Sequence, residues 1–184
     1  MIHPREPDRL SLAMLPTPLL RLPRLEQSLG GGCTILLKRD DLTGLELSGN
    51  KVRKLEYILA AALRDGVRTI ITEGTPQSNH CRATAAACAR LGLGCVLLLR
   101  PEPPTAVEGN HLLGCLFGAR TRAFPREDFV RRREQIVAHL IQEESRAGRR
   151  ARFVPMGASE PLGCWGYIAA AAELDAQLAA AGVE

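Results

Sequence analysis

The chain of 184 residues has the composition of one globular domain, or of one domain and a fraction, with 46% hydrophobic and 24% charged residues. The net charge of +4 is mild. Arginines gather between positions 131 and 152, but no aromatic residue lies among them to stack on bases, so we expect a solvated helix face and no nucleic-acid partner. No apolar run approaches the ~20 residues of a membrane span, so no membrane partner is expected.

Six cysteines are scattered along the sequence without a Cys-x-x-Cys pair or a tight cluster with histidine. This spacing argues against a metal site and against a secreted disulfide scaffold. The first residues include acids and have no apolar core, so no export signal is evident. We therefore expect free thiols, a reducing compartment and a cytoplasmic location.

The first 30 residues are rich in proline and loosely patterned, and a short β-type run at 34–39 precedes an amphipathic helix at about 50–65. From there strands and helices alternate. Strands are expected at 69–73, 95–100, 119–124 and 151–156, each followed by a helix, at about 78–91, 107–117, 126–147 and 161–181. This alternation predicts an α/β fold of three layers, in which helices flank both faces of a parallel sheet.

In such sheets ligands bind beyond the carboxyl ends of the strands, where helices begin. Two loops lie there, at 73–80 and at 156–163. Ser78 or Asn79 is expected to cap the helix after the first loop, and the free N–H groups behind the cap would suit an anion such as a carboxylate. Each loop taken singly is also compatible with an ordinary strand-to-helix turn. No glycine-rich nucleotide loop is present in the sequence.

Lys51 begins the helix at about 50–65, directly after Gly49 and Asn50. A positive charge is unfavourable in a first helical turn, because the helix dipole is positive there. Such a lysine is either a solvated surface residue or one kept for reaction, since neutral lysines form Schiff bases with carbonyl compounds. The spacing alone leaves both interpretations open.

Several short motifs occur in a fixed order: Leu15-Pro16-Thr17-Pro18, Lys38-Arg39-Asp40-Asp41, Ser48-Gly49-Asn50-Lys51, Arg53-Lys54-Leu55-Glu56, Gln77-Ser78-Asn79-His80, Gly109-Asn110 and Gly166-Tyr167. Together they resemble the pyridoxal-phosphate enzymes of the D-cysteine desulfhydrase and aminocyclopropane-carboxylate deaminase family, which has the tryptophan-synthase-β-like fold. The match runs along nearly the whole chain, and the combination is more specific than any one motif.

The resemblance implies a role for each matching residue. Lys51 would bind pyridoxal phosphate covalently and later move the α-proton of the substrate. Asn79 would hydrogen-bond the phenolic oxygen of the cofactor, Lys54 would help to neutralise its phosphate, and Asn50 would also contact it. The turn from Ser78 to His80 would hold the carboxylate of a small amino-acid substrate, with Ser78 also a candidate nucleophile or proton relay.

The resemblance further implies that D-cysteine loses sulfide and is converted to pyruvate and ammonia. His80 favours this desulfhydrase type, since the deaminases are alike in having glutamine there. 1-Aminocyclopropane-1-carboxylate deaminase and L-cysteate sulfo-lyase remain alternatives.

Family members are about twice as long, so the resemblance implies that the chain corresponds to their N-terminal part. Residues 1–51 would begin the large domain, 52–165 would form the small domain, and 166–184 would return to the large domain. The glycine-rich phosphate loop is expected beyond position 184, and the full-length form is expected to be a homodimer. Apolar surface would be left open on the last helix and on Leu12, Leu15, Leu19, Leu20 and Leu22. A non-catalytic module that binds a partner is the alternative from another class.

Overall fold

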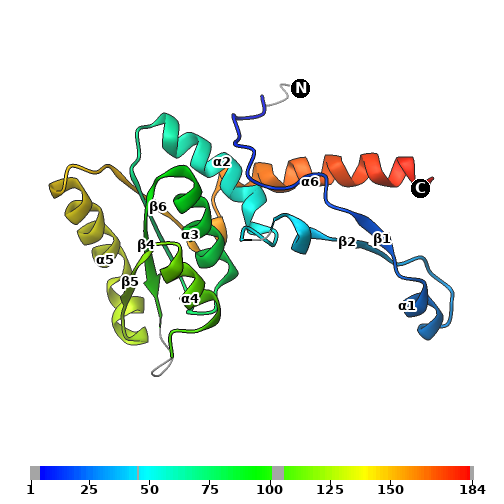
Figure 1. Ribbon diagram of the computed structural model, residues 1–184, viewed down its shortest axis with the longest axis horizontal. Coiled ribbons are helices and arrows are strands. Elements are labelled where there is room, and N and C mark those ends of the chain that lie inside the picture. Colours follow the sequence, from blue (N-terminus) through cyan, green and yellow to red (C-terminus); the bar gives the residue numbers. More distant parts are fainter. Residues whose placement is uncertain (1–4, 45, 101–105, 183–184) are drawn as a thin grey trace.

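The computed structural model describes residues 5–44, 46–100 and 106–182 (Figure 1). Its centre is a parallel four-stranded sheet in the order β5-β4-β3-β6. The strands are β3 (Thr69–Gly74), β4 (Gly94–Leu99), β5 (Arg120–Ala123) and β6 (Ala151–Val154). The helices that follow them are α3 (Asn79–Leu91), α4 (Gly109–Leu116), α5 (Arg126–Arg146) and α6 (Pro161–Ala180), and α2 (Lys51–Arg64) precedes the sheet.

The α/β class predicted from the sequence is confirmed, and so are the strands and helices predicted between residues 50 and 181, with small differences at their ends. The last strand is the one difference of substance. It ends at Val154 instead of Met156, and a short 3-10 turn, η2 (Met156–Ala158), follows it. Part of the Pro-rich connection after Arg100 lies outside the described residues.

Helices cover both faces of the sheet, with α5 on one side and α2, α3 and α4 on the other (Figure 1). Successive residues of a strand point to opposite faces, so neighbouring β3 residues enter different cores. Ile70 packs in the larger cluster with Leu55 and Leu97, whereas Ile71 packs with Leu98 and the α5 residues of the smaller one. The strands are therefore buried on both sides, as expected of a parallel sheet between helices.

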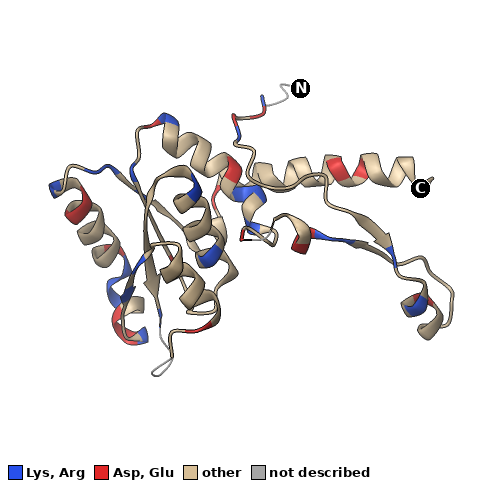
Figure 2. Cartoon of the chain, in the orientation of Figure 1, with Lys and Arg blue, Asp and Glu red and all other residues tan. Residues whose placement is uncertain are grey.

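The long helix α5 carries acidic and basic residues side by side (Figure 2). Glu144 is buried, accepting hydrogen bonds from Arg149 Nε (2.6 Å) and Thr69 Oγ1 (2.8 Å). The bond from Arg149 does most to lower the pKa of Glu144, which falls to about 2 although burial acts against it. Arg133 pairs with Glu73 at 2.8 Å. The prediction of a purely solvated arginine face was therefore wrong for Arg133, which is partly buried and ties α5 to β3, whereas Arg149 stays exposed while it pairs with Glu144.

The N-terminal region is more regular than the sequence suggested. It forms β1 (Leu19–Arg21), α1 (Pro23–Ser28), β2 (Leu36–Lys38) and the 3-10 turn η1 (Asp40–Leu42). The two strands pair antiparallel, with Leu20 opposite Leu37, and extend away from the larger sheet (Figure 1). A three-residue strand carries little periodicity of its own, because its hydrogen bonds come from a partner distant in sequence.

The expectation of open apolar surface is right for Leu20, which is 40% exposed, and wrong for Leu12, which is 6% exposed. The chain at Leu12 is held against α2, because its N–H donates to Glu56 Oε1 at 2.7 Å. As expected, α6 is largely open: Gly163 and Gly166 are the buried residues within its described length. No helix in the described part of the chain has the length and apolar character needed to cross a membrane.

Candidate active site

The candidate site lies beyond the carboxyl end of β3, where η2 contacts β3, α2 and α3. Lys51 is the first residue of α2, as predicted, and is partly buried. A methyl group on Gly157 of η2 would lie 3.9 Å from Lys51 Cε, so the lysine side chain runs along this turn. Within the described residues, Lys51 makes no hydrogen bond or ion pair. Its amine is therefore held beside η2 without a partner.

Lys54 lies one turn further along α2 and is only 8% exposed. Its Nζ donates to the Gly157 carbonyl oxygen at 2.9 Å. Burial lowers the pKa of Lys54, and the nearby charge of Lys51 lowers it further. The two lysines thus flank η2 and repel each other, an arrangement that an anion between them would relieve.

The loop after β3 is compact and confirms the predicted helix cap. Ser78 precedes α3 and its Oγ accepts from Cys81 N at 3.2 Å. Gly74 ends β3 where a Cβ would lie 2.6 Å from Cys81 Sγ and 2.9 Å from Ser78, so only glycine fits there. The close approach places the Ser78 hydroxyl directly over the end of the strand.

Asn79, the first residue of α3, is exposed. Its Oδ1 accepts from Asn110 Nδ2 at 2.9 Å, and the same amide donates to the Gln77 carbonyl oxygen at 2.9 Å. The start of α4 therefore orients the Asn79 carboxamide. Asn110 belongs to a motif quoted from the sequence, but the sequence alone suggested no contact for it.

His80 is buried, with 3% of its surface exposed. Its Nε2 lies 2.7 Å from Thr72 Oγ1 on β3, and that hydroxyl lies 2.8 Å from the Val154 carbonyl oxygen at the end of β6. Burial, followed by the charges of Lys51 and Lys54, lowers the pKa of His80 to about 4. The imidazole is consequently neutral at pH 7. Sequence analysis did not identify Thr72.

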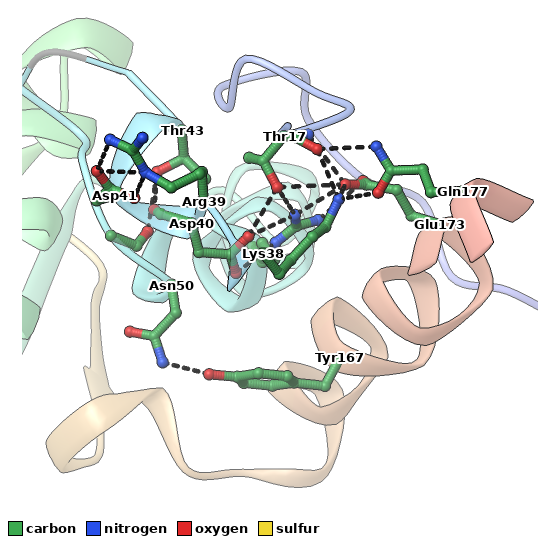
Figure 3. Close-up of polar contacts among 12 residues, drawn as sticks. Thr17, Lys38, Arg39, Asp40, Asp41, Thr43, Asn50, Tyr167, Glu173 and Gln177 are labelled. Atoms are coloured by element: carbon green, nitrogen blue, oxygen red, sulfur yellow. Dashed lines mark hydrogen bonds and ion pairs between the residues drawn. The ribbon is translucent and has the colours of Figure 1, made fainter. Parts of the chain in front are cut away.

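Asn50, which directly precedes Lys51, reaches across to α6. Its Nδ2 donates to the hydroxyl of Tyr167, which is 43% exposed (Figure 3). A residue of α6 thereby holds the segment that leads into Lys51.

A network of charged residues surrounds Arg53, on the turn of α2 that carries Lys51. Its guanidinium donates to both oxygens of Asp40, at 2.8 and 2.9 Å, and to both oxygens of Glu173 on α6, each at 3.0 Å. Arg53 is 2% exposed. Two carboxylates from distant segments therefore neutralise a buried cation, as such a charge requires.

The network continues through Thr17, Lys38 and Gln177 (Figure 3). Lys38 Nζ donates to the Thr17 carbonyl oxygen at 2.7 Å and also contacts Glu173 and Gln177. Burial by itself would raise the pKa of Glu173, but the hydrogen bonds from Arg53 and Lys38 lower it to about 2. The network therefore joins the N-terminal segment, α2 and α6.

Helix α6 crosses the first turns of α2 at Gly163 and Gly166. A Cβ at Gly166 would lie 2.4 Å from the Arg53 carbonyl oxygen, and one at Gly163 would lie 2.4 Å from the Ala158 carbonyl oxygen. Two glycines three positions apart share a helix face. The spacing of the two glycines can be seen in the sequence, but the sequence does not show that they face α2.

The structure thus gathers Lys51, Lys54 and His80 around η2. It places Ser78 and Asn79 at the adjoining start of α3, and it ties Asn50 to α6.

Comparison with known proteins bears on this arrangement. Residues 10–183 match the family model described as "Pyridoxal-phosphate dependent enzyme". The chain is 41% identical over 185 residues to a bifunctional D-cysteine desulfhydrase/1-aminocyclopropane-1-carboxylate deaminase, mitochondrial, of Arabidopsis thaliana, covering 96% of this chain and 45% of the relative. It is 43% identical over 176 residues to a D-cysteine desulfhydrase of Salmonella choleraesuis, covering 93% of this chain and 52% of the relative.

Among solved structures, a homologue of aminocyclopropane-carboxylate deaminase superposes with a TM-score of 0.82 at 38% identity, covering 94% of this chain and 51% of the other. The chain therefore spans about half the length of the curated relatives that it matches.

Proposed function

Because the chain belongs to the family of pyridoxal-phosphate-dependent enzymes, we propose that it acts as a lyase or deaminase of small amino acids, converting D-cysteine to pyruvate, sulfide and ammonia. The observation that carries this proposal is the amine of Lys51, which has no partner among the described residues and lies against η2, near the cation of Lys54 and the neutral imidazole of His80. The relatives named D-cysteine desulfhydrase support the choice of substrate.

The donor set suits pyridoxal phosphate. The cofactor needs an amine for its aldehyde, cations or N–H donors for its phosphate, and a donor for its phenolic oxygen. Lys51 would supply the amine and Asn79 Nδ2 the phenolic donor. Lys54 uses two of its three N–H groups, one on the Gly157 carbonyl oxygen at 2.9 Å and one on Ser159 Oγ at 3.4 Å, which leaves one for the phosphate. Asn50 would contact the cofactor beside Lys51.

When bound, pyridoxal phosphate draws electrons away from the Cα atom of an attached amino acid. The protein then needs only to orient the substrate and to move protons. The Lys51 amine would take the α-proton and return it. Backbone N–H groups of the turn from Ser78 to His80 would hold the substrate carboxylate. The Ser78 hydroxyl accepts from Cys81 N and keeps its own proton for donation to the substrate.

A second activity, deamination of 1-aminocyclopropane-1-carboxylate, is favoured by the names of the Arabidopsis relative and of the solved structure. We further propose the domain division 1–51, 52–165 and 166–184, a homodimer in the full-length form, and a cytoplasmic location. The open face of α6 supports the division, and the free cysteines suit a reducing compartment.

The test is to add pyridoxal phosphate to the purified chain, record the absorption spectrum, reduce with borohydride and map the modified peptide. The sequence contains three lysines, Lys38, Lys51 and Lys54, so the map is decisive. We expect the adduct on Lys51. Lys51→Ala should abolish it, and the matched variant Lys54→Arg should keep it on Lys51 with weaker cofactor affinity. An adduct on another lysine, or none, would refute the proposal for this chain.

Activity is then compared on two substrates, with sulfide release measured for D-cysteine and ammonia release for 1-aminocyclopropane-1-carboxylate. Release of sulfide by the wild type, absent in Lys51→Ala, is expected. Ammonia without sulfide would favour the second activity.

A further inference from the structure

The hydrogen bonds of Thr72 determine which nitrogen of His80 carries the proton. A threonine hydroxyl has one proton to donate and lone pairs with which to accept. Thr72 Oγ1 lies 2.8 Å from the Val154 carbonyl oxygen, which can only accept, and 2.7 Å from His80 Nε2. If the hydroxyl donates to Val154, it must accept from an N–H on His80 Nε2.

The other tautomer is less favourable for two reasons. With the proton on Nδ1, Thr72 would have to donate to Nε2, and the Val154 oxygen would face a hydroxyl oxygen at 2.8 Å without a proton between them. The Nδ1–H group would also be buried without an acceptor, since Nδ1 has no hydrogen-bond partner among the described residues. A buried donor without an acceptor costs free energy of folding.

The favoured tautomer leaves His80 Nδ1 as a bare acceptor. The side chain is buried, and the two ring nitrogens diverge, so Nδ1 points away from Thr72. The cations whose charges reach the ring are Lys51 and Lys54, the two lysines that flank η2. Buried polar atoms normally have a hydrogen-bond partner. The donor that His80 Nδ1 lacks can therefore come from a ligand bound in this position.

We infer that Thr72 is a positioning residue, which holds His80 as the neutral tautomer protonated on Nε2 so that Nδ1 accepts a hydrogen bond from the bound small molecule. The ligand group would be an ammonium, hydroxyl or thiol, and a ligand that offers only acceptors at this point would be disfavoured. This inference rests on the proposed function for the identity of the ligand, but the tautomer itself does not.

The tautomer can be measured without cofactor. Long-range ¹H–¹⁵N correlation spectra of the histidine-labelled chain distinguish a protonated ring nitrogen from a bare one, and His80→Gln identifies the His80 signals among the four histidines. We expect protonation on Nε2 in the wild type and in Thr72→Ser. Thr72→Val should lower the tautomer ratio roughly 5- to 10-fold, the effect of one hydrogen bond.

Thr84→Val is the matched control, because the Thr84 hydroxyl is buried one turn along α3 and donates to the His80 backbone oxygen at 2.8 Å, away from the ring. It should leave the ratio unchanged. Wild-type protein protonated on Nδ1 would overturn the inference without any variant, and so would an unchanged ratio in Thr72→Val.

In a second experiment, D-serine, a small amino acid with a hydroxyl group, is added to protein loaded with pyridoxal phosphate. The Nδ1 resonance should move toward the hydrogen-bonded position, and an unmoved resonance on a protein that binds D-serine would refute the role as acceptor. A protein that takes up no cofactor fails the proposed function instead, and the cofactor-free spectra then decide the inference alone.

Discussion

Replacing Gly166 with alanine tests whether the contact between α6 and α2 determines the geometry around Lys51. The added Cβ would lie 2.4 Å from the Arg53 carbonyl oxygen, 2.5 Å from the Arg53 carbonyl carbon and 2.7 Å from Lys54 N. All three are backbone atoms of a helix turn, which cannot rotate away as a side chain would. Ordinary contact begins at 3.4 Å, so the two helices must separate by about 1 Å.

The magnitude follows from two opposing terms. Overpacking of a closely packed contact costs about 1–3 kcal/mol, and the upper value applies because backbone meets the new methyl group. Alanine is favoured over glycine inside a helix by about 1 kcal/mol. The expected net loss is therefore about 2 kcal/mol in the free energy of unfolding, and the separation should also weaken the cofactor binding that we propose at Lys51.

The assay is urea unfolding followed by circular dichroism, with Gly114→Ala in α4 as the control. Gly114 is also a buried helical glycine, but its Cβ would meet only Leu97 Cδ1, at 3.1 Å, the end of a flexible side chain. The control should be neutral or slightly stabilised. If both variants were equally stable, the close crossing of α6 over α2 would not be a constraint, and the reasoning would fail.

Two further predictions concern buried carboxylates. Glu173→Gln should lower the free energy of unfolding, measured by urea titration, by roughly 2–3 kcal/mol, because it leaves the buried Arg53 with one carboxylate. The control is Asp41→Asn, in the exposed pair with Arg39, which should cause no measurable change in the same titration. The pKa of Glu144 falls from 4.5 to about 2 on folding, so its contribution is complete above pH 4.5 and is lost as the pH falls towards 2. Glu144→Gln should therefore be less stable than the wild type at pH 7, and thermal unfolding should show the difference narrowing between pH 5 and 2; a constant difference would contradict this assignment.

Local patterns in the sequence were sufficient for the sheet and its helices. The apolar strands of the parallel sheet are nearly continuous in sequence, and Ser78 caps α3 as its residue type and position predicted. The start of α2 at Lys51 was predictable from neighbouring residues as well, since Gly49 and Asn50 directly precede the amphipathic pattern of the helix. These features depend on residues within a few positions of one another.

Other features were decided by tertiary structure alone. Glu173 meets Arg53 across 120 positions of sequence, and Thr72 meets His80 only because α3 folds back over the end of β3. Leu12 is buried because Glu56 holds its backbone against α2. No local periodicity encodes such pairs, since each depends on two elements arriving at the same place. The sequence by itself therefore determined the four-stranded sheet, the helices that flank it and the start of α2 at Lys51. Packing decided the short N-terminal elements and the polar groups that surround Lys51, because hydrogen bonds and ion pairs between distant segments exist only after the chain has folded.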